Sequence, residues 1–229
     1  MRPCARVCAG NSRRGWFSGL AAMLALTAWA TSASGASLTV NVTRPDGKPV
    51  SGAVVLLHGP TGSPAPLPAA FVVDQVNQTF TPDLTVIPVG STVTFPNSDR
   101  VSHQVYSFSP TKRFQLPLYR GTPYAPITFA NPGVVTLGCN IHDDMIAYLI
   151  VTDAGWSGRT AQDGSWTVSN LPAGEFRVGV WHPRMREPTT TIERPLKLEA
   201  ALPVRLDVQL NRPLRPEQLG QKPRSWSDY

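Results

Sequence analysis

Residues 133–152 have the sequence GVVTLGCNIHDDMIAYLIVT, in which two strongly apolar segments flank a short polar one. Short apolar runs that are rich in β-branched residues are typical of buried strands. The polar segment carries a thiol, an imidazole and a thioether at Cys139, His142 and Met145, with the spacing Cys-x2-His-x2-Met. A tight loop between two adjacent strands can turn three side chains toward one point. We therefore predict a β-hairpin whose loop gathers three potential metal ligands.

The chemistry of these side chains favours copper. Thiolate and thioether sulfur are soft ligands, and imidazole also suits copper. Two histidines, one cysteine and a weak axial methionine form the trigonal set of a copper site that transfers electrons. The second histidine has to come from a neighbouring strand, and His103 is placed for that after the strand-like segment VTFPN (93–97). The alternatives are an inert buried thiol at Cys139, a packing role for Met145 and a surface position for His103.

The rest of the chain also has the pattern of a β protein. Only 16% of its 229 residues are charged, and its 23 prolines disfavour long helices. Alternating segments next to turn residues predict strands on both sides of Pro45-Asp46-Gly47, over 166–168, over 176–180, and one or two closing strands over 195–210. The segment PTGSPAPLPA (60–69) has the composition of a linker.

Two separated segments resemble one β-sandwich family. VTRPDGKPVSGAVV (42–55) resembles the opening of prealbumin-like, carboxypeptidase-regulatory-type sandwiches, and TAQDGSWTVSNLPAGEFRV (160–178) resembles their third and fourth strands. About a hundred residues separate segments that are close together in that family. The resemblance therefore implies a second β domain inserted in a loop of the first, which exposed loops tolerate. The alternative is one larger sandwich without separable parts.

Residues 70–152 resemble a cupredoxin, and their short Cys-x2-His-x2-Met loop resembles the amicyanin variant. This resemblance implies that Cys139, His142 and Met145 are copper ligands and that His103 is the first histidine of the site. With the flanking prealbumin-like segments, the layout resembles exported cupredoxin-like proteins labelled "methylamine utilization protein".

The chain departs from the cupredoxin pattern at one position. Cupredoxins commonly follow the first histidine with an asparagine that ties the ligand loops together, whereas this chain has Gln104. Asn97 and Ser102 are the candidates for the bracing role.

These features predict an all-β protein that consists of a cupredoxin Greek-key sandwich plus a second, prealbumin-like β-sandwich. The predicted parts are a signal peptide (1–36), the discontinuous prealbumin-like sandwich (37–62 and 153–210), the cupredoxin domain (63–152) and a flexible tail (211–229).

The first 36 residues have the order of a secretory signal. Four arginines and no acid precede an apolar run from Trp16 to Ala30, and small residues follow, so we expect cleavage after Ala36. A single-pass membrane anchor is the alternative. Without this segment, the chain has 17 Lys and Arg and 15 Asp and Glu, so its net charge is near +2. This charge does not indicate a surface that binds nucleic acid. Cys139 then remains as a single thiol, and no integral membrane segment is left.

We therefore predict a periplasmic protein that binds one copper ion, alternates between Cu+ and Cu2+ in blue-copper-type electron transfer, and meets redox partner proteins transiently. We expect no enzymatic activity, because the chain has no nucleophile motif, no suggestive carboxylate pair and no phosphate loop. The competing hypotheses are a copper chaperone or sensor, and a structural binding module with a passenger copper site. We expect His58 and His182 to be packed or capping residues rather than a second metal site.

Overall fold

The structure is a computed structural model that describes residues 35–121, 123–185, 191–199 and 204–210. Within these residues there are 17 β-strands and no α-helix, so the predicted all-β class is confirmed. The predicted signal peptide up to Ser34 and the predicted tail over 211–229 lie outside the described residues. Among the residues that are described, no helix is long and apolar enough to span a membrane.

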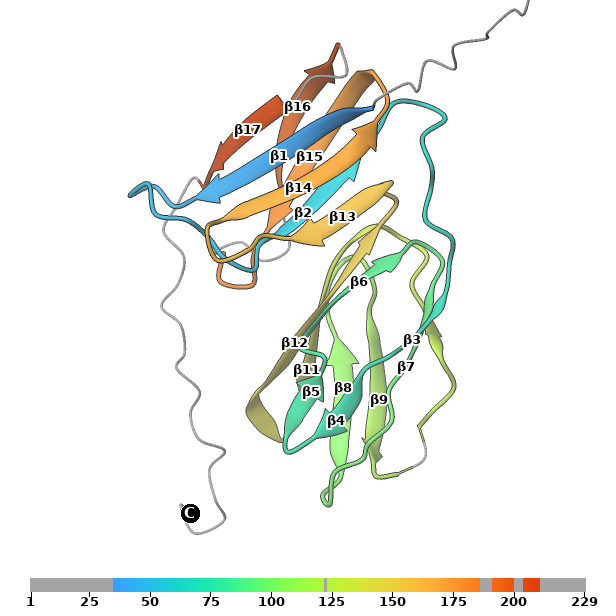
Figure 1. Cartoon of the computed structure of the whole chain (residues 1–229). Coiled ribbons are helices and arrows are strands. Elements are labelled where there is room, and N and C mark those ends of the chain that lie inside the picture. The colour runs from blue at the N-terminus through green and yellow to red at the C-terminus, as the bar shows by residue number, and fades with distance from the viewer. Residues whose placement is uncertain (1–34, 122, 186–190, 200–203, 211–229) are drawn as a thin grey trace, which may run out of the picture. The chain divides into compact units, whose positions relative to one another are not determined.

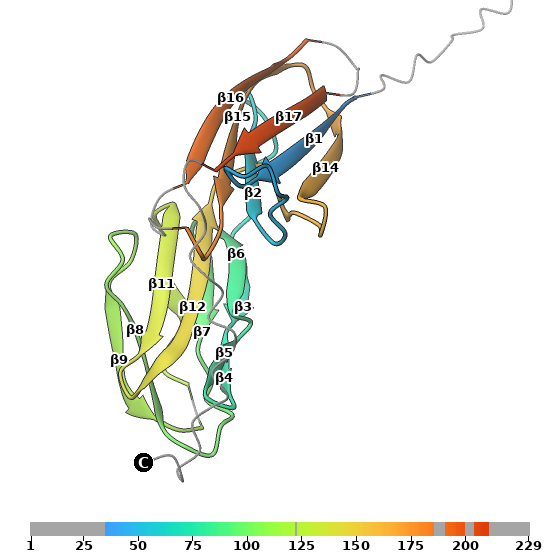
Figure 2. The ribbon, with the colours of Figure 1, turned by 90° about the vertical axis from the view of Figure 1, so that its left-hand side faces the viewer.

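Residues 70–152 form two sheets and a small hairpin. The larger sheet has the strand order β6 (Leu84–Pro88), β12 (His142–Thr152), β11 (Gly133–Cys139), β8 (His103–Ser107) and β9 (Phe114–Tyr119). The smaller sheet has the order β10 (Ile127–Thr128), β7 (Thr92–Thr94) and β3 (Ala70–Val72), and β4 (Asp74–Val76) pairs with β5 (Thr79–Thr81). Figures 1 and 2 show β8 next to the β11–β12 hairpin, although residues 108–132 separate them in the sequence.

Alternating side chains of the larger sheet fill the core between the two sheets. Val135 and Leu137 of β11 are fully buried, and Ala147 and Leu149 of β12 belong to the same cluster. Since side chains alternate between the faces of a strand, Cys139 continues the inward row of β11. Each buried Val or Leu contributes about 1.5–3 kcal/mol, and a one-residue slip would turn the whole row outward. The core therefore fixes the register of the hairpin that carries the candidate ligands.

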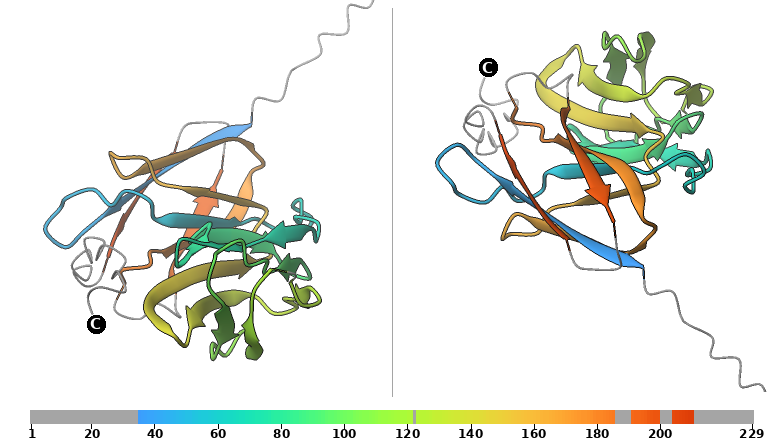
Figure 3. Two further views of the ribbon diagram at one scale, coloured as in Figure 1. Left: turned by 90° about the horizontal axis from the view of Figure 1, so that it is seen from below. Right: turned by 90° about the horizontal axis from the view of Figure 1, so that it is seen from above.

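Segments from both sides of residues 70–152 form a second sandwich. One of its sheets has the order β14 (Ser165–Leu171), β1 (Ala36–Thr43) and β17 (Val204–Gln209). The other has the order β13 (Trp156–Arg159), β2 (Val54–His58), β15 (Gly174–Trp181) and β16 (Ile192–Leu198). Figure 3 shows these strands from two further directions, with β1 in blue and β17 in red.

The alternating residues of β1 and a glycine turn next to this strand shape the second sandwich. Leu38, Val40 and Val42 are fully buried, and the polar residues between them face outward. The turn between β13 and β14 contains Gly164 at a φ of +77°, and a Cβ there would lie 2.6 Å from the carbonyl oxygen of Val42. Only glycine fits this turn without strain, because it has no Cβ and adopts a positive φ freely.

Three clusters of buried apolar side chains occur in the described residues. One lies in the sandwich of β1 and β2, and one lies in residues 70–152. The third contains Val54, Leu56 and Trp181 together with Val134 and Ile150. The predicted linker over 60–69 contains no strand. The division into an inserted domain (63–152) and a discontinuous one stays a prediction.

Candidate metal centre

Cys139 is the last residue of β11. The alternation that buries Val135 and Leu137 also turns this side chain toward the core, where it is 4% exposed. It is a free cysteine and belongs to the apolar cluster of this sandwich. The strand therefore delivers one sulfur donor to the end of the core from which the hairpin loop emerges.

His142 faces Cys139 across the hairpin. The two residues are partners in the β11–β12 ladder, and an irregularity between Gly138 and Cys139 shifts the register there. Nδ1 of His142 lies 3.8 Å from Sγ of Cys139. A bulge of this kind re-aims the side chains that follow it. Its effect here is to bring two residues that are three positions apart into contact at the tip of the hairpin.

His103 reaches the same point from β8. Its side chain points inward like that of Val105 and is fully buried, with 0% exposure. Nδ1 of His103 lies 3.9 Å from Sγ of Cys139, and the rings of His103 and His142 have centroids 4.9 Å apart. Ligand atoms of the two histidines and the cysteine all lie within 4.8 Å of one another. Two distant segments therefore place three donors around one position.

The spacing of the donors fits a bound metal ion. An ion that bonds sulfur at about 2.3 Å and imidazole nitrogen at about 2.0–2.1 Å keeps these two atoms about 3.6–3.8 Å apart at tetrahedral to trigonal angles. The two sulfur–nitrogen distances of 3.8 and 3.9 Å are close to this range. One thiolate and two imidazoles also form a donor set that soft and borderline metals prefer. His103, Cys139 and His142 could therefore hold a metal ion with little rearrangement.

Met145 is the fourth residue expected at this site. It is 1% exposed and lies in the same apolar cluster as Cys139, three residues after His142 on β12. The structure thus brings His103, Cys139 and His142 together and buries Met145 in the cluster behind them. Its role as an axial ligand stays a prediction.

The arrangement of residues 70–152 can be compared with the expectation from the sequence and with solved structures. The larger sheet carries the Cys–His hairpin at its centre, with the second histidine on the neighbouring strand, as the resemblance in the sequence implies. This part of the chain has a cupredoxin-like fold. Matching solved structures include a purple cupredoxin from Nitrosopumilus maritimus, with 26% identity, a TM-score of 0.32, and coverage of 35% of this chain and 98% of that chain.

Two further solved structures match part of the chain. A mutant of amicyanin in its reduced Cu(I) form has 22% identity and a TM-score of 0.34, and the match covers 42% of this chain and 98% of that chain. A copper-containing nitrite reductase from Thermus scotoductus has 31% identity and a TM-score of 0.34, with 38% of this chain covered but only 23% of that chain. No protein-family model and no curated protein matches the chain.

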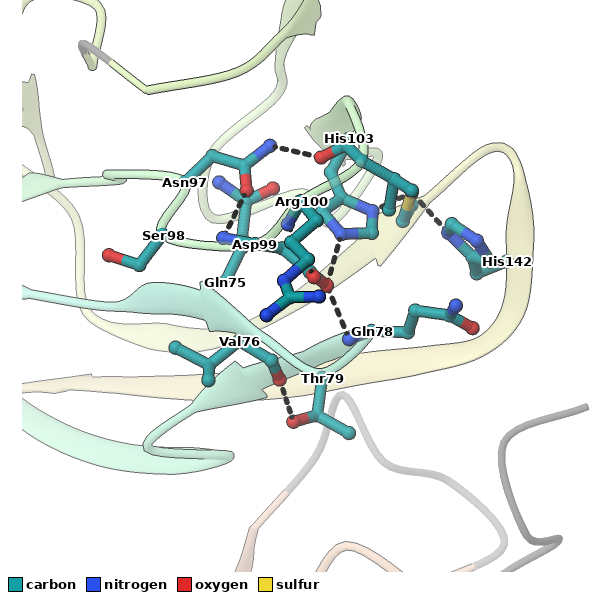
Figure 4. A network of polar contacts seen from close by, with 12 residues as sticks. Gln75, Val76, Gln78, Thr79, Asn97, Ser98, Asp99, Arg100, His103 and His142 are labelled. Carbon is teal, nitrogen blue, oxygen red and sulfur yellow. Dashed lines mark hydrogen bonds and ion pairs between the residues drawn. The ribbon is translucent and has the colours of Figure 1, made fainter. Parts of the chain in front are cut away.

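A network of polar contacts surrounds His103 in the cupredoxin-like sandwich (Figure 4). Asp99 lies 2.9 Å from Nε2 of His103 and accepts hydrogen bonds from the backbone N–H groups of Gln78 and Arg100. Burial alone would raise the pKa of Asp99, but the hydrogen bonds from His103 and from these two N–H groups lower it below its ordinary value. Asp99 is therefore an ionised acceptor near neutral pH. We did not expect this residue from the sequence, because it belongs to an irregular loop.

Asn97, one of the two candidates for a bracing role, fixes the loop before His103. Its Nδ2 donates to the carbonyl oxygens of Val101 and Tyr119, and its Oδ1 accepts the N–H of Asp99. Asn97 is buried, its contact with Tyr119 is fully buried, and the other two contacts are partly buried. The side chain therefore ties the loop before His103 to the end of β9.

Tyr119 extends this network toward β4. Its hydroxyl donates to the carbonyl oxygen of Phe95 and accepts a hydrogen bond of 2.6 Å from Nε2 of Gln75. Burial raises the pKa of Tyr119 to about 12, although the hydrogen bond from Gln75 opposes the shift. The phenol therefore stays protonated and keeps its donor at all physiological pH values.

The electrostatics of His142 suit a neutral ligand. Burial and the nearby His103 lower its pKa from the ordinary value, against the opposing charge of Asp99. A neutral imidazole is the form that binds a metal ion. His142 is only partly buried, and its neighbours Ile141, Asp143 and Asp144 are exposed. The hairpin tip is therefore the part of the centre that meets solvent.

The other two described histidines lie away from this centre. His182 is buried, and its Nδ1 accepts the N–H of Arg184, which is a capping contact. His58 pairs with Asp153 through its Nδ1 at 3.2 Å. Neither belongs to the group of potential metal ligands found among the described residues.

Proposed function

We propose that this chain is an exported copper protein that carries single electrons between partner proteins and is not itself an enzyme. The observation that supports it is the convergence of Cys139, His103 and His142, whose ligand atoms lie within 4.8 Å of one another. Two imidazoles and one thiolate form the equatorial set of electron-transfer copper sites, and Met145 would add the weak axial sulfur. Copper held by these residues would supply a one-electron couple between Cu(II) and Cu(I).

The protein part of this function is to keep the ligands in place. His103 and Cys139 are buried on paired elements of one sheet, and Asn97 ties down the loop before His103. Closely packed interiors resist rearrangement. A site with such ligands changes little in shape when the charge of the ion changes, which favours rapid electron transfer.

The proposed route for electrons runs through the hairpin tip. His142 is partly exposed, whereas His103 is fully buried, so His142 offers the ligand edge that a partner can approach. Ile141 beside it is 52% exposed and gives an apolar contact. A small patch of this kind suits a transient redox partner, because weak electron-transfer encounters use small interfaces.

The proposed location is the periplasm. Its support is the order of charged, apolar and small residues before Ala36 in the sequence. An oxidising compartment is compatible with Cys139 as the single remaining cysteine, because that thiol has no internal disulfide partner.

Copper titration of the metal-free protein tests the proposal. We expect one copper ion per chain, an intense visible charge-transfer band from the thiolate to Cu(II), and a reversible one-electron wave in voltammetry. The variant Cys139→Ser should lose the band, because a hydroxyl cannot replace the thiolate, whereas Ser102→Ala serves as a control that should keep it.

Two results would contradict the electron-carrier proposal. A colourless Cu(II) adduct, or the absence of stoichiometric binding, would rule out an electron-transfer copper site of this type. Stoichiometric Cu(I) binding with rapid loss to a competing chelator and no reversible wave would instead favour a chaperone.

A further inference from the structure

The carboxylate of Asp99 is the only acidic group among the described residues that is paired with His103. Oδ2 of Asp99 lies 2.9 Å from Nε2 of His103, on the side of the ring opposite to the nitrogen that faces Cys139 (Figure 4). The side chain of His103 is 0% exposed and that of Asp99 is 13% exposed. Because water is largely excluded, the contact is stronger than the same pair on a surface would be.

Backbone groups hold the carboxylate in this position. The N–H of Gln78 donates to Oδ2 of Asp99 at 2.7 Å, and the N–H of Arg100 donates to Oδ1 at 2.7 Å. The N–H of Asp99 itself donates to Oδ1 of Asn97 at 3.0 Å. These three bonds fix both the backbone and the carboxylate of Asp99, so its orientation does not depend on His103.

The turn between β4 and β5 is shaped to deliver the N–H of Gln78. Asn77 and Gln78 have φ values of 51° and 58°, the left-handed pair that a two-residue hairpin turn requires. Asparagine tolerates this conformation, whereas glutamine is unusual in it, so the turn carries strain. In such a turn the N–H of the second residue is not used between the strands, and here it points at Asp99.

The contact determines which nitrogen of His103 carries the proton. An ionised carboxylate only accepts hydrogen bonds, so Nε2 of His103 has to donate. The neutral ring then has an unprotonated Nδ1, and this is the atom 3.9 Å from Sγ of Cys139. The imidazole is therefore set in the tautomer and orientation of a metal ligand before any metal arrives.

We propose that Asp99 is a positioning residue of the metal centre, which locks the Nε2–H tautomer of His103 and makes the site prefer Cu(II) over Cu(I). This inference rests on the proposed copper function. A fixed negative charge next to a ligand stabilises the more highly charged ion more, and a carboxylate partner makes the imidazole a stronger donor. Asp99 would thereby lower the reduction potential of the centre.

The variant Asp99→Asn in the full chain tests this role. We expect Cu(II) affinity to fall about 10- to 100-fold, the range typical for the loss of such a partner. Cu(I) affinity should fall less, so the Cu(II)/Cu(I) affinity ratio should decrease and the potential should rise. Nitrogen-15 NMR of the metal-free wild type should show the Nε2–H tautomer of His103, and the variant should show a mixture.

Asp74→Asn is the matched control. Asp74 accepts hydrogen bonds from the N–H and the hydroxyl of Ser98, in the same loop, and from the N–H of Gln75, without contacting either histidine. This variant should lose stability but keep the tautomer and the affinity ratio. If Asp74→Asn changed the tautomer of His103 and the Cu(II)/Cu(I) affinity ratio as much as Asp99→Asn does, the proposal would be overturned. Both variants would then act by loosening the loop in general.

The outcomes separate this inference from the proposed function. If wild type and Asp99→Asn both bind one copper with the charge-transfer band but have the same affinity ratio, the role of Asp99 is refuted and the electron-carrier proposal stands. If Asp99→Asn does not fold, the metal-free wild type decides, because a dominant Nδ1–H tautomer of His103 would also refute the role. If wild type binds no copper, the proposed function fails, and with it the preference for Cu(II).

Discussion

Asn97 shows how a single side chain can hold a loop next to the candidate metal centre. Its amide makes three hydrogen bonds that join the loop before His103 to the end of β9. An amide is suited to this position because it offers two N–H donors and an acceptor oxygen, whereas a carboxylate has no donor and a hydroxyl group has only one. The brace lies before the histidine in the sequence rather than directly after it, so the motif alone does not reveal it.

Replacing Asn97 tests the brace. The variant Asn97→Ala leaves the carbonyl oxygens of Val101 and Tyr119 and the N–H of Asp99 without their partner. We expect the free energy of unfolding, measured in urea, to fall by about 2–4 kcal/mol. Gln104→Ala on β8 is the control and should change it by less than about 0.5 kcal/mol. Equal effects of the two variants would assign the bracing role back to Gln104.

His182 illustrates an effect at the level of one element, the turn that follows β15. Burial and the charge of Arg184 lower the pKa of His182 to about 4, although the hydrogen bond to Ser51 opposes them. In the unfolded chain a histidine has a pKa of about 6.5. Between these values the unfolded state binds more protons, so the stability is complete above pH 6.5 and is lost as the pH falls toward 4.

The variant His182→Gln isolates this contribution. At pH 7 we expect it to be less stable than wild type, because the neutral imidazole accepts the N–H of Arg184. Near pH 5 the difference should be smaller, since the folded wild type then has to exclude a proton from His182. Thermal unfolding at both pH values measures it. A difference that stays constant, or grows toward low pH, would contradict the neutral, buried state of this ring.

Sequence patterns predicted strands well but could not assign them to sheets. The alternation over 37–43 gave the inward row of β1, and the segment 195–210 was expected to hold one or two strands. The structure has β16 and β17 there, but β16 pairs with β15 while β17 pairs with β1 in the other sheet. Alternation tells which face of a strand is buried, whereas pairing depends on contacts between segments that are far apart in the sequence.

The candidate site likewise contains contacts that the sequence predicts and contacts that it does not. The contact of Cys139 with His142 follows from a spacing of three residues in a hairpin, so the motif predicts it. The contact of Asp99 with the N–H of Gln78 joins residues 21 positions apart and uses a backbone donor, which no residue type signals. A carboxylate a few residues before a candidate histidine ligand was the only available hint.

At the scale of the whole molecule, copper should act as a ligand of the folded state. The donors of β8, β11 and β12 converge only in the fold, so the unfolded chain lacks the site. Binding therefore adds stability, about 2.7 kcal/mol when free copper exceeds the dissociation constant 100-fold. For a chain of this size we expect the melting temperature to rise by roughly 5–10 °C. Differential scanning calorimetry with and without copper measures the shift.

Two variants locate the origin of that shift. Cys139→Ser should lose most of the increment, because the thiolate supplies the strongest bond. Leu38→Ala, in the core of the other sandwich, should lower the stability by about 2–5 kcal/mol with or without copper. It should keep the copper increment, because it shares no partner with the ligands and distant effects add. If Cys139→Ser kept the full increment, copper would be stabilising the chain from somewhere other than this centre.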